Sequence, residues 1–416
     1  MHCLADYLLL SLLCLTGVIA SPVRPRTPET NGPVATAWYA GYHAIDYPIE
    51  NIPWDKYTSV TYAFGLPSKN ASVINLAPLD TLLLPQFVEA AHKNNVKAKL
   101  SLGGWTGSLW YSTNVATADN RTAFTNAIVA LAEQYQLDGI DFDWEYPGKV
   151  GVGCNAVSPN DTANFLLFLQ ELRQAVGQDF LLTAAVATIP FSDSEGNPSA
   201  DVSGFAEVLS YIAIMNYDIF GPFTLTFGPN APLKDSCASA AAQKQGSATS
   251  AVSAWTTAGF PTKQIVLGVP AYGHSVTVPP SAAYCNGTHE LVPYALFNAS
   301  VHAPGDKWDN PTAVDVCGVQ QNFGGTFDFW ALVEDGWLTS DGKPAEGIDY
   351  TYDSCSQTPF IYNSTTQLMI SYDDAQSFAA KGQFIKENEL LGFSMWEMGG
   401  DYNDILLNSI RSAIGF

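Results

Sequence analysis

Eight short β-rich runs alternate with stretches of helical periodicity along this chain, and this alternation constrains its fold more than any other feature. Strands that alternate with helices favour βα units and a parallel sheet. Eight such units predict a closed (β/α)8 barrel, with functional side chains at the carboxyl ends of the strands. The runs are Ala35–Gly41, Ser59–Phe64, Lys97–Leu102, Gly139–Trp144, Leu181–Ala187, Ile212–Asn216, Ile265–Ala271 and Gly392–Trp396.

The clearest helical stretch is Asp161–Val176. We expect Asp161 to cap its start and Gly177 to end it. A second helix is expected over Asp373–Asn388. The apolar residues of the first helix recur on one stripe, which predicts the face that packs on the sheet: Phe165, Phe168, Leu169 and Leu172.

The spacing of the units breaks once, between the seventh and eighth β-rich runs. The intervening stretch, residues 275–370, is too long for a loop. It contains β-rich and helical pieces such as Phe327–Trp337 and Gln367–Ser371. These predict a small α+β insertion domain over one side of the barrel mouth, with the barrel itself formed by residues 34–274 and 371–416.

The first 20 residues hold an apolar run, Tyr7–Leu15, followed by small residues up to Ala20, a pattern typical of a signal peptide. The segment before the run has no Lys or Arg, so an uncleaved anchor is the alternative, although the run is too short to span a bilayer. Residues 21–33 are rich in proline and are expected to form an extended leader, with folding from about Val34. We therefore expect a secreted, extracellular protein.

The charge of the chain excludes some partners. Acidic residues outnumber basic ones by 40 to 18, and the net charge of −22 would repel nucleic acids and anionic membrane surfaces. Ten Trp residues and an aromatic content of 12% supply flat faces on which sugar rings of a neutral polymer can stack, unless most of them are core. No stretch after the first 20 residues looks transmembrane, and we expect a monomer.

Five cysteines follow the first 20 residues, with spacings unlike those of a zinc site. In an oxidising compartment we expect two disulfides and one buried thiol, with the pairing left open. The five are Cys154, Cys237, Cys285, Cys317 and Cys355. Six glycosylation sequons are consistent with a glycosylated surface, and they begin at Asn70, Asn120, Asn160, Asn286, Asn298 and Asn363.

The stretch Leu137–Tyr146 concentrates acidic residues as no other stretch does. With the period of two of a strand, Asp141, Asp143 and Glu145 share one face, and three apolar residues share the other. Coupling between like charges raises one pKa of the set, as a general acid requires. A metal-binding or solvated acidic strand end is the alternative, and Asp138, of opposite parity, is expected to anchor the strand.

This stretch resembles the active-site signature of glycoside hydrolase family 18, the chitinases, and the resemblance extends from about Ala35 to Asp404. It implies hydrolysis of β-1,4-linked N-acetylglucosamine polymers, with chitin or chitooligosaccharides as the partner and with no metal and no cofactor. The segments that carry the resemblance are Asp138–Glu145, Ser101–Gly104 like the third-strand motif, Met215–Asp218 like the sixth-strand motif, and Trp396 at the end of the eighth strand.

The resemblance also implies roles for the catalytic candidates. Glu145 would be the proton donor, Asp143 would turn toward the acetamido group of the sugar, and Asp141 would share a proton with Asp143. Tyr217 would donate a hydrogen bond to the acetamido oxygen, unless it is a buried phenol satisfied by the local backbone. The substrate's own acetamido group would act as the nucleophile, as in substrate-assisted retaining glycosidases.

Several aromatic and polar residues are candidates for substrate binding. Trp396 is expected to form the hydrophobic floor under the scissile sugar, and Trp105 to stack on the next sugar or to be core. Gly103 and Gly104 permit close packing near the site. The remaining candidates are Asp218, Tyr272, Met215, Tyr39 and Phe64.

One position departs from the family pattern. The seventh-strand motif usually ends in Arg, whereas residues 268–274 read Gly-Val-Pro-Ala-Tyr-Gly-His. An imidazole cannot replace a permanent bidentate donor, so His274 puts substrate contacts from that wall in question. Two other functions are kept open: a catalytically inactive chitin lectin of the same fold, and an endo-β-N-acetylglucosaminidase acting on N-glycan cores.

Overall fold

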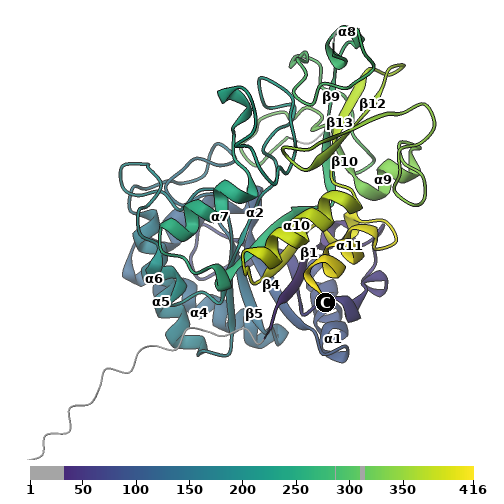
Figure 1. The fold of residues 1–416 in the computed structure, drawn as a ribbon. Helices are drawn as coiled ribbons and strands as arrows, with labels where there is room; N and C mark the ends of the chain where they lie inside the picture. The colour runs from purple at the N-terminus through teal and green to yellow at the C-terminus, as the bar shows by residue number, and fades with distance from the viewer. Residues whose placement is uncertain (1–31, 286, 310–313) are drawn as a thin grey trace, which may run out of the picture.

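Eight parallel strands close into a barrel in the computed structural model, which describes residues 32–285, 287–309 and 314–416 (Figure 1). Each strand pairs with the next, and β14 pairs with β1 to complete the ring, so the predicted (β/α)8 barrel is confirmed. A short strand, β3 (Ile74–Asn75), pairs antiparallel with the end of β2. The barrel strands are β1 (Val34–Ala40), β2 (Ser59–Pro67), β4 (Lys97–Gly103), β5 (Gly139–Asp143), β6 (Leu181–Val186), β7 (Tyr211–Ile214), β8 (Ile265–Pro270) and β14 (Gly392–Trp396).

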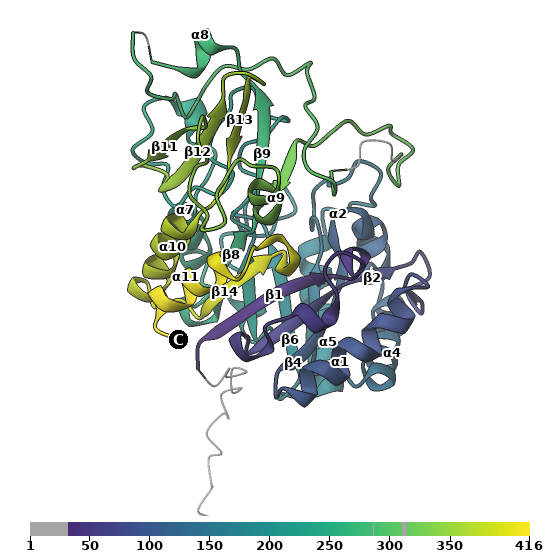
Figure 2. The ribbon, with the colours of Figure 1, turned by 90° about the vertical axis from the view of Figure 1, so that its right-hand side faces the viewer.

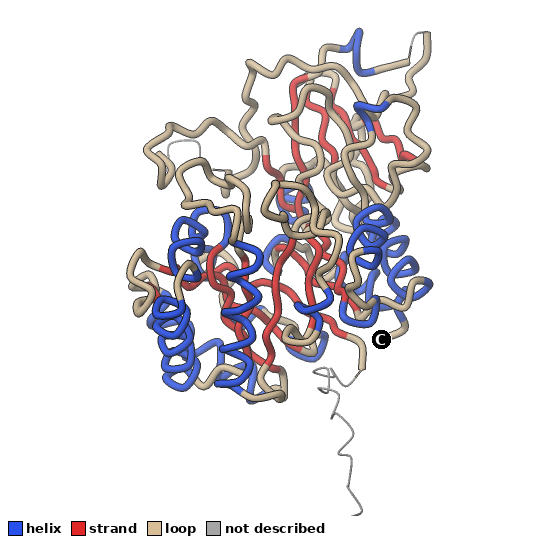
Figure 3. Tube along the Cα trace, turned by 90° about the vertical axis from the view of Figure 1, so that its left-hand side faces the viewer, coloured by secondary structure: helices blue, strands red, loops and turns tan. Residues whose placement is uncertain are grey.

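Helices surround the barrel and cover the outer faces of the strands (Figure 3). On β5, Phe142 points outward and packs against Phe165 and Phe168 of α5, with ring centroids 5.8 and 5.6 Å apart. The apolar stripe predicted for this helix is therefore its core face. The helices of the barrel are α1 (Asp80–Lys93), α2 (Gly104–Gly107), α3 (Tyr111–Val115), α4 (Ala118–Tyr135), α5 (Asp161–Val176), α6 (Ser203–Ala206), α7 (Ala248–Thr257), α10 (Ala375–Glu387) and α11 (Ile405–Ile414).

Helix α5 has the predicted bounds and ends at Gly177, whose φ is 79°. The predicted capping role of Asp161 is wrong, because Asn160 is the N-cap and Asp161 is the first helical residue. The buried Asp161 carboxylate instead accepts hydrogen bonds from the backbone N–H groups of Ser158 and Gly148, at 2.9 and 3.2 Å. It thereby fastens the loop that follows β5 to the start of α5.

A second, antiparallel sheet stands above the barrel mouth beside β8 and β14 (Figure 2). It has the strand order β10-β9-β13-β12-β11. The sheet begins at Tyr272, directly after β8 and Ala271, so residues 272–274, which the sequence assigned to the barrel, belong to it. Its elements are β9 (Tyr272–Thr277), α8 (Pro280–Ala283), β10 (Thr326–Asp328), α9 (Phe329–Glu334), β11 (Asp349–Asp353), β12 (Thr358–Asn363) and β13 (Leu368–Ser371).

Two disulfides join this insertion to barrel loops, as the cysteine count predicted. Cys154–Cys317 connects it to the loop after β5, and Cys237–Cys355 connects it to the loop after β7. The predicted buried thiol is wrong, since Cys285 is free but exposed. It follows α8 and Tyr284, in a segment that belongs to none of the strands of the sheet.

The expected signal peptide, residues 1–20, and nearly all of the expected leader, residues 21–33, lie outside the described residues. The first strand starts at Val34, where folding was expected to begin. Of the sequon asparagines, Asn286 is also outside the described residues, Asn70, Asn160 and Asn298 are exposed, and Asn120 and Asn363 are partly buried. No helix in the described part is both long and apolar enough to cross a bilayer.

Candidate active site

Strand β5 directs Asp141 into the barrel and surrounds it with hydrogen-bond donors. One carboxylate oxygen accepts from the Trp38 indole N–H at 3.0 Å and from the Ser101 hydroxyl at 2.9 Å. The other accepts from the Thr183 hydroxyl at 2.5 Å. The donors come from β1, β4 and β6, and the side chain is only 1% exposed. Three donors from three different strands therefore fix the position of this carboxylate.

Asp143 and Glu145 form a coupled pair at the carboxyl end of the same strand. A hydrogen bond from Asp143 to Glu145 joins their side chains. Burial, together with the charges of Glu145 and Asp141, holds the pKa of Asp143 well above its usual range. Burial also raises the pKa of Glu145 to about 7. The pair therefore retains a proton near neutral pH, while Asp143 Oδ1 has no hydrogen-bond partner among the described residues.

The backbone of Glu145 is held by the segment that follows β4. Its N–H donates to the Ser108 hydroxyl oxygen at 2.9 Å, and that hydroxyl lies 3.1 Å from the Asp143 carbonyl oxygen. Gly103 permits this close approach, because it has a φ of 104° and a Cβ there would stand 2.2 Å from the same carbonyl oxygen. The expectation that this glycine allows close packing near the site is confirmed.

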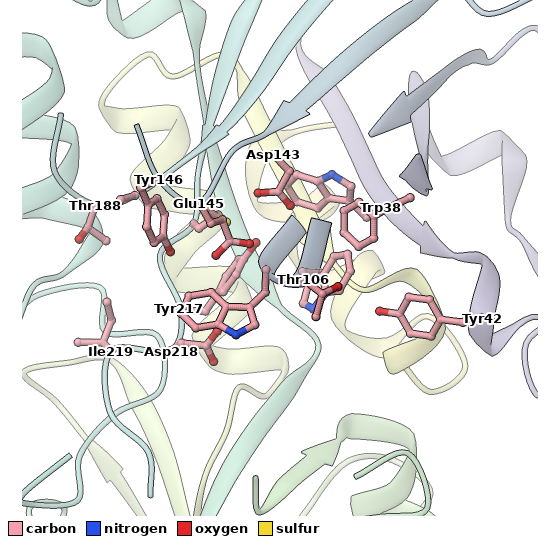
Figure 4. Close-up of a pocket in the computed structure, with 15 residues that line it drawn as sticks. Trp38, Tyr42, Thr106, Asp143, Glu145, Tyr146, Thr188, Tyr217, Asp218 and Ile219 are labelled. Carbon is pink, nitrogen blue, oxygen red and sulfur yellow. The ribbon is translucent and has the colours of Figure 1, made fainter. Parts of the chain in front are cut away.

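A cavity of about 600 Å³ opens above the pair (Figure 4). It brings together residues that lie on or directly after β1, β2, β4, β5, β6, β7 and β14, as expected for the carboxyl face of a barrel. Eight of the predicted site residues line it: Asp143, Glu145, Tyr217, Asp218, Met215, Trp396, Trp105 and Phe64. Sequence reasoning missed the other lining residues, which are Trp38, Tyr42, Thr106, Tyr146, Ala187, Thr188 and Ile219.

The segment after β7 places Tyr217 and Asp218 beside Glu145 (Figure 4). The Tyr217 hydroxyl forms no hydrogen bond within the described part of the chain, so it is available to a ligand, and the backbone-satisfied alternative finds no support. Burial raises the pKa of Tyr217 well above its usual value, which keeps the phenol protonated as a donor. The neighbouring Asn216 is buried and donates to the Pro232 carbonyl at 3.1 Å, which holds this segment in place.

Aromatic rings form the floor and the rim of the cavity. The ring of Trp396 packs against Trp38 at 6.1 Å and against Phe64 at 5.6 Å between centroids. Trp105 is 50% exposed, so its core alternative is wrong. The cavity therefore offers a half-buried aromatic floor and one projecting indole.

The placement of Tyr39 in the site is wrong. Its side chain is 1% exposed and lies on the helix side of β1, where it stacks on Phe87 of α1 at 5.4 Å. Its hydroxyl donates to the Tyr47 carbonyl at 3.0 Å. Because alternate residues of a strand face opposite sides, the neighbouring Trp38 points into the barrel instead. The alternation of side chains along the strand is the signal that distinguishes Trp38 from Tyr39.

The predicted site residue Tyr272 lies in a hollow that adjoins the cavity and shares Tyr42, Asp218 and Trp396 with it. Its hydroxyl donates to Asp218 at 2.8 Å. The Nε2 atom of His274 lies 2.7 Å from the same carboxylate oxygen. The histidine that departs from the family pattern therefore lines this hollow and contacts Asp218.

Asp138 lies at the opposite end of β5 from the cavity. Its carboxylate accepts from the Ala98 N–H at 2.8 Å and contacts His92 of α1, also at 2.8 Å. Its predicted anchoring role is confirmed. Throughout the described residues, no group of three or more His, Cys, Asp or Glu side chains is placed to hold a metal ion.

The sequence of this chain is similar to those of several known proteins. The family described as "Glycosyl hydrolases family 18" matches residues 36–401. A "chitinase-like effector" of Moniliophthora roreri is 47% identical, covering 98% of this chain and 100% of that protein. One of Moniliophthora perniciosa is 48% identical, covering 92% and 87%. "Chitinase A1" of Niallia circulans is 30% identical, covering 76% and 42%.

Solved structures show the same fold. The crystal structure of a chitinase from Rhizomucor miehei superposes with a TM-score of 0.82 at 31% identity, covering 92% of this chain and 100% of that one. The class V chitinase from Nicotiana tobaccum gives a TM-score of 0.73 at 25% identity, covering 92% and 99%.

Proposed function

The chain belongs to glycoside hydrolase family 18, and on that basis we propose that it is a secreted chitinase, active on β-1,4-linked N-acetylglucosamine polymers. One observation supports activity most strongly: the hydrogen-bonded pair of Asp143 and Glu145, with a Glu145 pKa of about 7, at the base of the cavity. Several proteins that the chain resembles are named chitinases. A lectin would have no need of a protonated carboxyl pair there.

In this proposal Glu145 is the general acid. Its raised pKa keeps the carboxyl protonated near neutral pH, so that it can give a proton to the glycosidic oxygen as the bond to the leaving sugar breaks. A well-placed general acid contributes about 10² to 10⁴ in rate. The backbone contact to Ser108 holds Glu145 at the edge of the cavity for this step.

The nucleophile belongs to the substrate. The acetamido oxygen of the scissile sugar attacks the anomeric carbon, the bond to the leaving oxygen breaks, and an oxazolinium ion forms. Asp143 turns toward the acetamido group and accepts a hydrogen bond from its N–H, and Tyr217 donates to the acetamido oxygen. Water activated by Glu145 then opens the ring, so the product keeps the β configuration.

A second candidate is a chitin-binding protein of this fold without turnover. It is favoured by the relatives named "chitinase-like effector", which are 47% and 48% identical to this chain over the aligned residues. An endo-β-N-acetylglucosaminidase is the third. The insertion supports a linear polymer over a branched glycan, because with Trp308 and Asp328 it walls the hollow beside the cavity.

Purified protein should be tested on colloidal chitin, on chitin oligosaccharides and on a high-mannose glycopeptide. Release of reducing sugar from the first two, abolished in Glu145→Gln, supports the chitinase. Binding of oligosaccharide by the wild type without any release supports the lectin. Cleavage confined to the glycopeptide supports the endoglycosidase.

Secretion has its own test, because the expected signal peptide lies outside the described residues. The full chain, expressed in a eukaryotic host, should appear in the medium with Ser21 or a later residue at its amino terminus. Retention of the whole chain in the membrane fraction would instead support the uncleaved anchor. Size-exclusion chromatography with light scattering of the secreted material tests the proposed monomer.

A further inference from the structure

A lysine is buried inside the barrel beneath the catalytic carboxyl groups. Lys99 is on β4, has the same strand parity as Ser101, and is only 1% exposed. A lysine is almost never fully buried unless its charge is compensated. The mechanism proposed above does not use this cation, so its presence in the interior requires a reason.

The Lys99 ammonium is two hydrogen bonds away from Asp141. It donates to the Thr183 hydroxyl oxygen at 3.1 Å and to the Tyr211 hydroxyl at 2.7 Å, and it lies 4.8 Å from the centre of the Tyr211 ring. Thr183 in turn donates to Asp141 at 2.5 Å. Lys99 and Asp141 are therefore linked through one shared hydroxyl.

The direction of this link follows from the chemistry of its ends. An ammonium has three donors and no acceptor, so the Thr183 oxygen must accept from Lys99. Its single O–H then has only Asp141 to donate to within the described chain. The indole of Trp38 is also donor-only, so both oxygens of Asp141 accept hydrogen bonds from neighbouring strands.

We propose that Lys99 is a positioning residue for the catalytic pair: it orients Thr183 toward Asp141 and offsets the negative charge that Asp141 places beneath Asp143 and Glu145. The ammonium does not touch substrate. It acts through Thr183 and Asp141 on the two carboxyl groups that do the chemistry. The further consequence is that the pH range of activity is set partly by a cation outside the cavity.

Lys99 faces polar groups on three other strands of the barrel. From β7 it faces the Tyr211 phenol, and from β5 and β6 it faces Asp141 through Thr183. Asp143 and Glu145 lie nearer the mouth on the continuation of β5.

The test removes the charge and keeps the length of the side chain. In Lys99→Met, a nearby positive charge is lost, so the carboxyl pair should hold its protons to higher pH. We expect both limbs of the pH profile of kcat on a chitin oligosaccharide to move upward by about one unit, with KM little changed. If the role of Lys99 is merely structural, Lys99→Met will lower the stability of the protein and leave both limbs of the pH profile where they are.

Lys381→Met is the matched control. Lys381 is also fully buried, but it pairs with Asp373 at helix α10, outside the barrel. Its replacement should destabilise the protein without moving either limb. If Lys99→Met shifts the limbs no further than Lys381→Met does, the proposal is overturned.

A second pair of variants covers the case in which Lys99→Met does not fold. Thr183→Val removes the linking hydroxyl and should shift the limbs in the same upward direction, whereas Thr183→Ser keeps the hydroxyl and should hold them at their wild-type positions. If Thr183→Val and Thr183→Ser give the same pH profile, the hydrogen bond from Thr183 to Asp141 has no role in setting that profile. In the double variant, Lys99→Met with Thr183→Val, the shift should be smaller than the sum of the single shifts, and full additivity would contradict a shared path.

This inference rests on the proposed function only for its activity readout. Carboxyl ¹³C NMR follows the titration of Glu145 without any turnover, and the wild-type midpoint should lie near 7. In Lys99→Met the midpoint should rise by about one unit, and an unchanged midpoint would sink the proposal even if the protein is an active chitinase. If the Glu145 midpoint rises in Lys99→Met but the wild type has no chitinase activity, the positioning role of Lys99 is supported and the proposed function is overturned.

Discussion

Asp143 donates a hydrogen bond to Glu145 at the end of β5, and this contact joins two carboxyl groups that would otherwise repel each other. Both have raised pKa values, with burial as the main cause. Asp141, one layer below, is held by three donors and takes no part in that bond. The sharing of a proton between Asp141 and Asp143, which the family resemblance implies, stays a prediction.

Replacing Glu145 with Gln should lower kcat on chitin oligosaccharides by at least about 10², because the amide keeps the shape of the side chain but cannot donate the proton. Oligosaccharide binding and the unfolding temperature should change little. Steady-state kinetics and calorimetric titration measure the two effects separately. Near-wild-type turnover of a substrate with a poor leaving group would show that Glu145 is not the acid.

Activity should fall on the alkaline side as the pH rises through about 7. Burial raises the pKa of Glu145 to that value, so the acid is protonated below it and loses its proton above it. The optimum is therefore expected on the acidic side of neutrality, and a pH profile of kcat/KM measures it. An optimum above pH 8 would contradict this assignment.

The correction at β1 can be tested with two neighbouring residues. Trp38→Phe removes the indole donor to Asp141 and should lower kcat by about tenfold, the effect expected from one lost charge-assisted hydrogen bond. Tyr39→Phe removes only a hydroxyl that faces helix α1, and should leave kcat unchanged with at most a small loss of stability. If both variants lowered kcat equally, the placement of Trp38 in the site and of Tyr39 outside it would be contradicted.

The disulfide Cys154–Cys317 should stabilise the protein, because it joins the insertion to the loop after β5 and closes a long loop of chain. Replacing both cysteines with Ser should lower the free energy of unfolding by about 2–4 kcal/mol. Cys285→Ser, at the exposed free thiol, is the matched control and should cost less than about 0.5 kcal/mol. Denaturant titration compares them, and equal losses would show that the bridge does not stabilise the protein.

Most of the barrel was predictable because its strands and the signature on β5 have strong local patterns. All eight strands were found with ends within a few residues, and the alternation along β5 correctly separated Asp141 and Asp143 from Phe142. Applied to β1, the same alternation would have selected Trp38 rather than Tyr39. That error came from matching aromatic type without the parity of the strand.

The rest of the site was not predictable, because it depends on the paths of loops. Tyr42, Tyr146 and Thr188 lie in loops after the strands. In a loop, the position of a residue in the sequence does not tell in which direction its side chain points. Lys99 was missed for a different reason: a charged residue near the start of a strand is usually exposed, as its neighbour Lys97 is. Only the register of β4 against β5 and β6 shows that Lys99 lies under the catalytic carboxyl groups.

The configuration of the first product tests the central claim most directly, because the acetamido group can act as nucleophile only if the enzyme retains the anomeric configuration. Time-resolved proton NMR of chitin oligosaccharide hydrolysis should show the β-anomer first, followed by slow conversion to the equilibrium mixture. Digestion of partly deacetylated chitin should give new reducing ends that are all acetylated. Initial α-anomer, or deacetylated reducing ends in quantity, would contradict the substrate-assisted mechanism and make Asp143 an ordinary base.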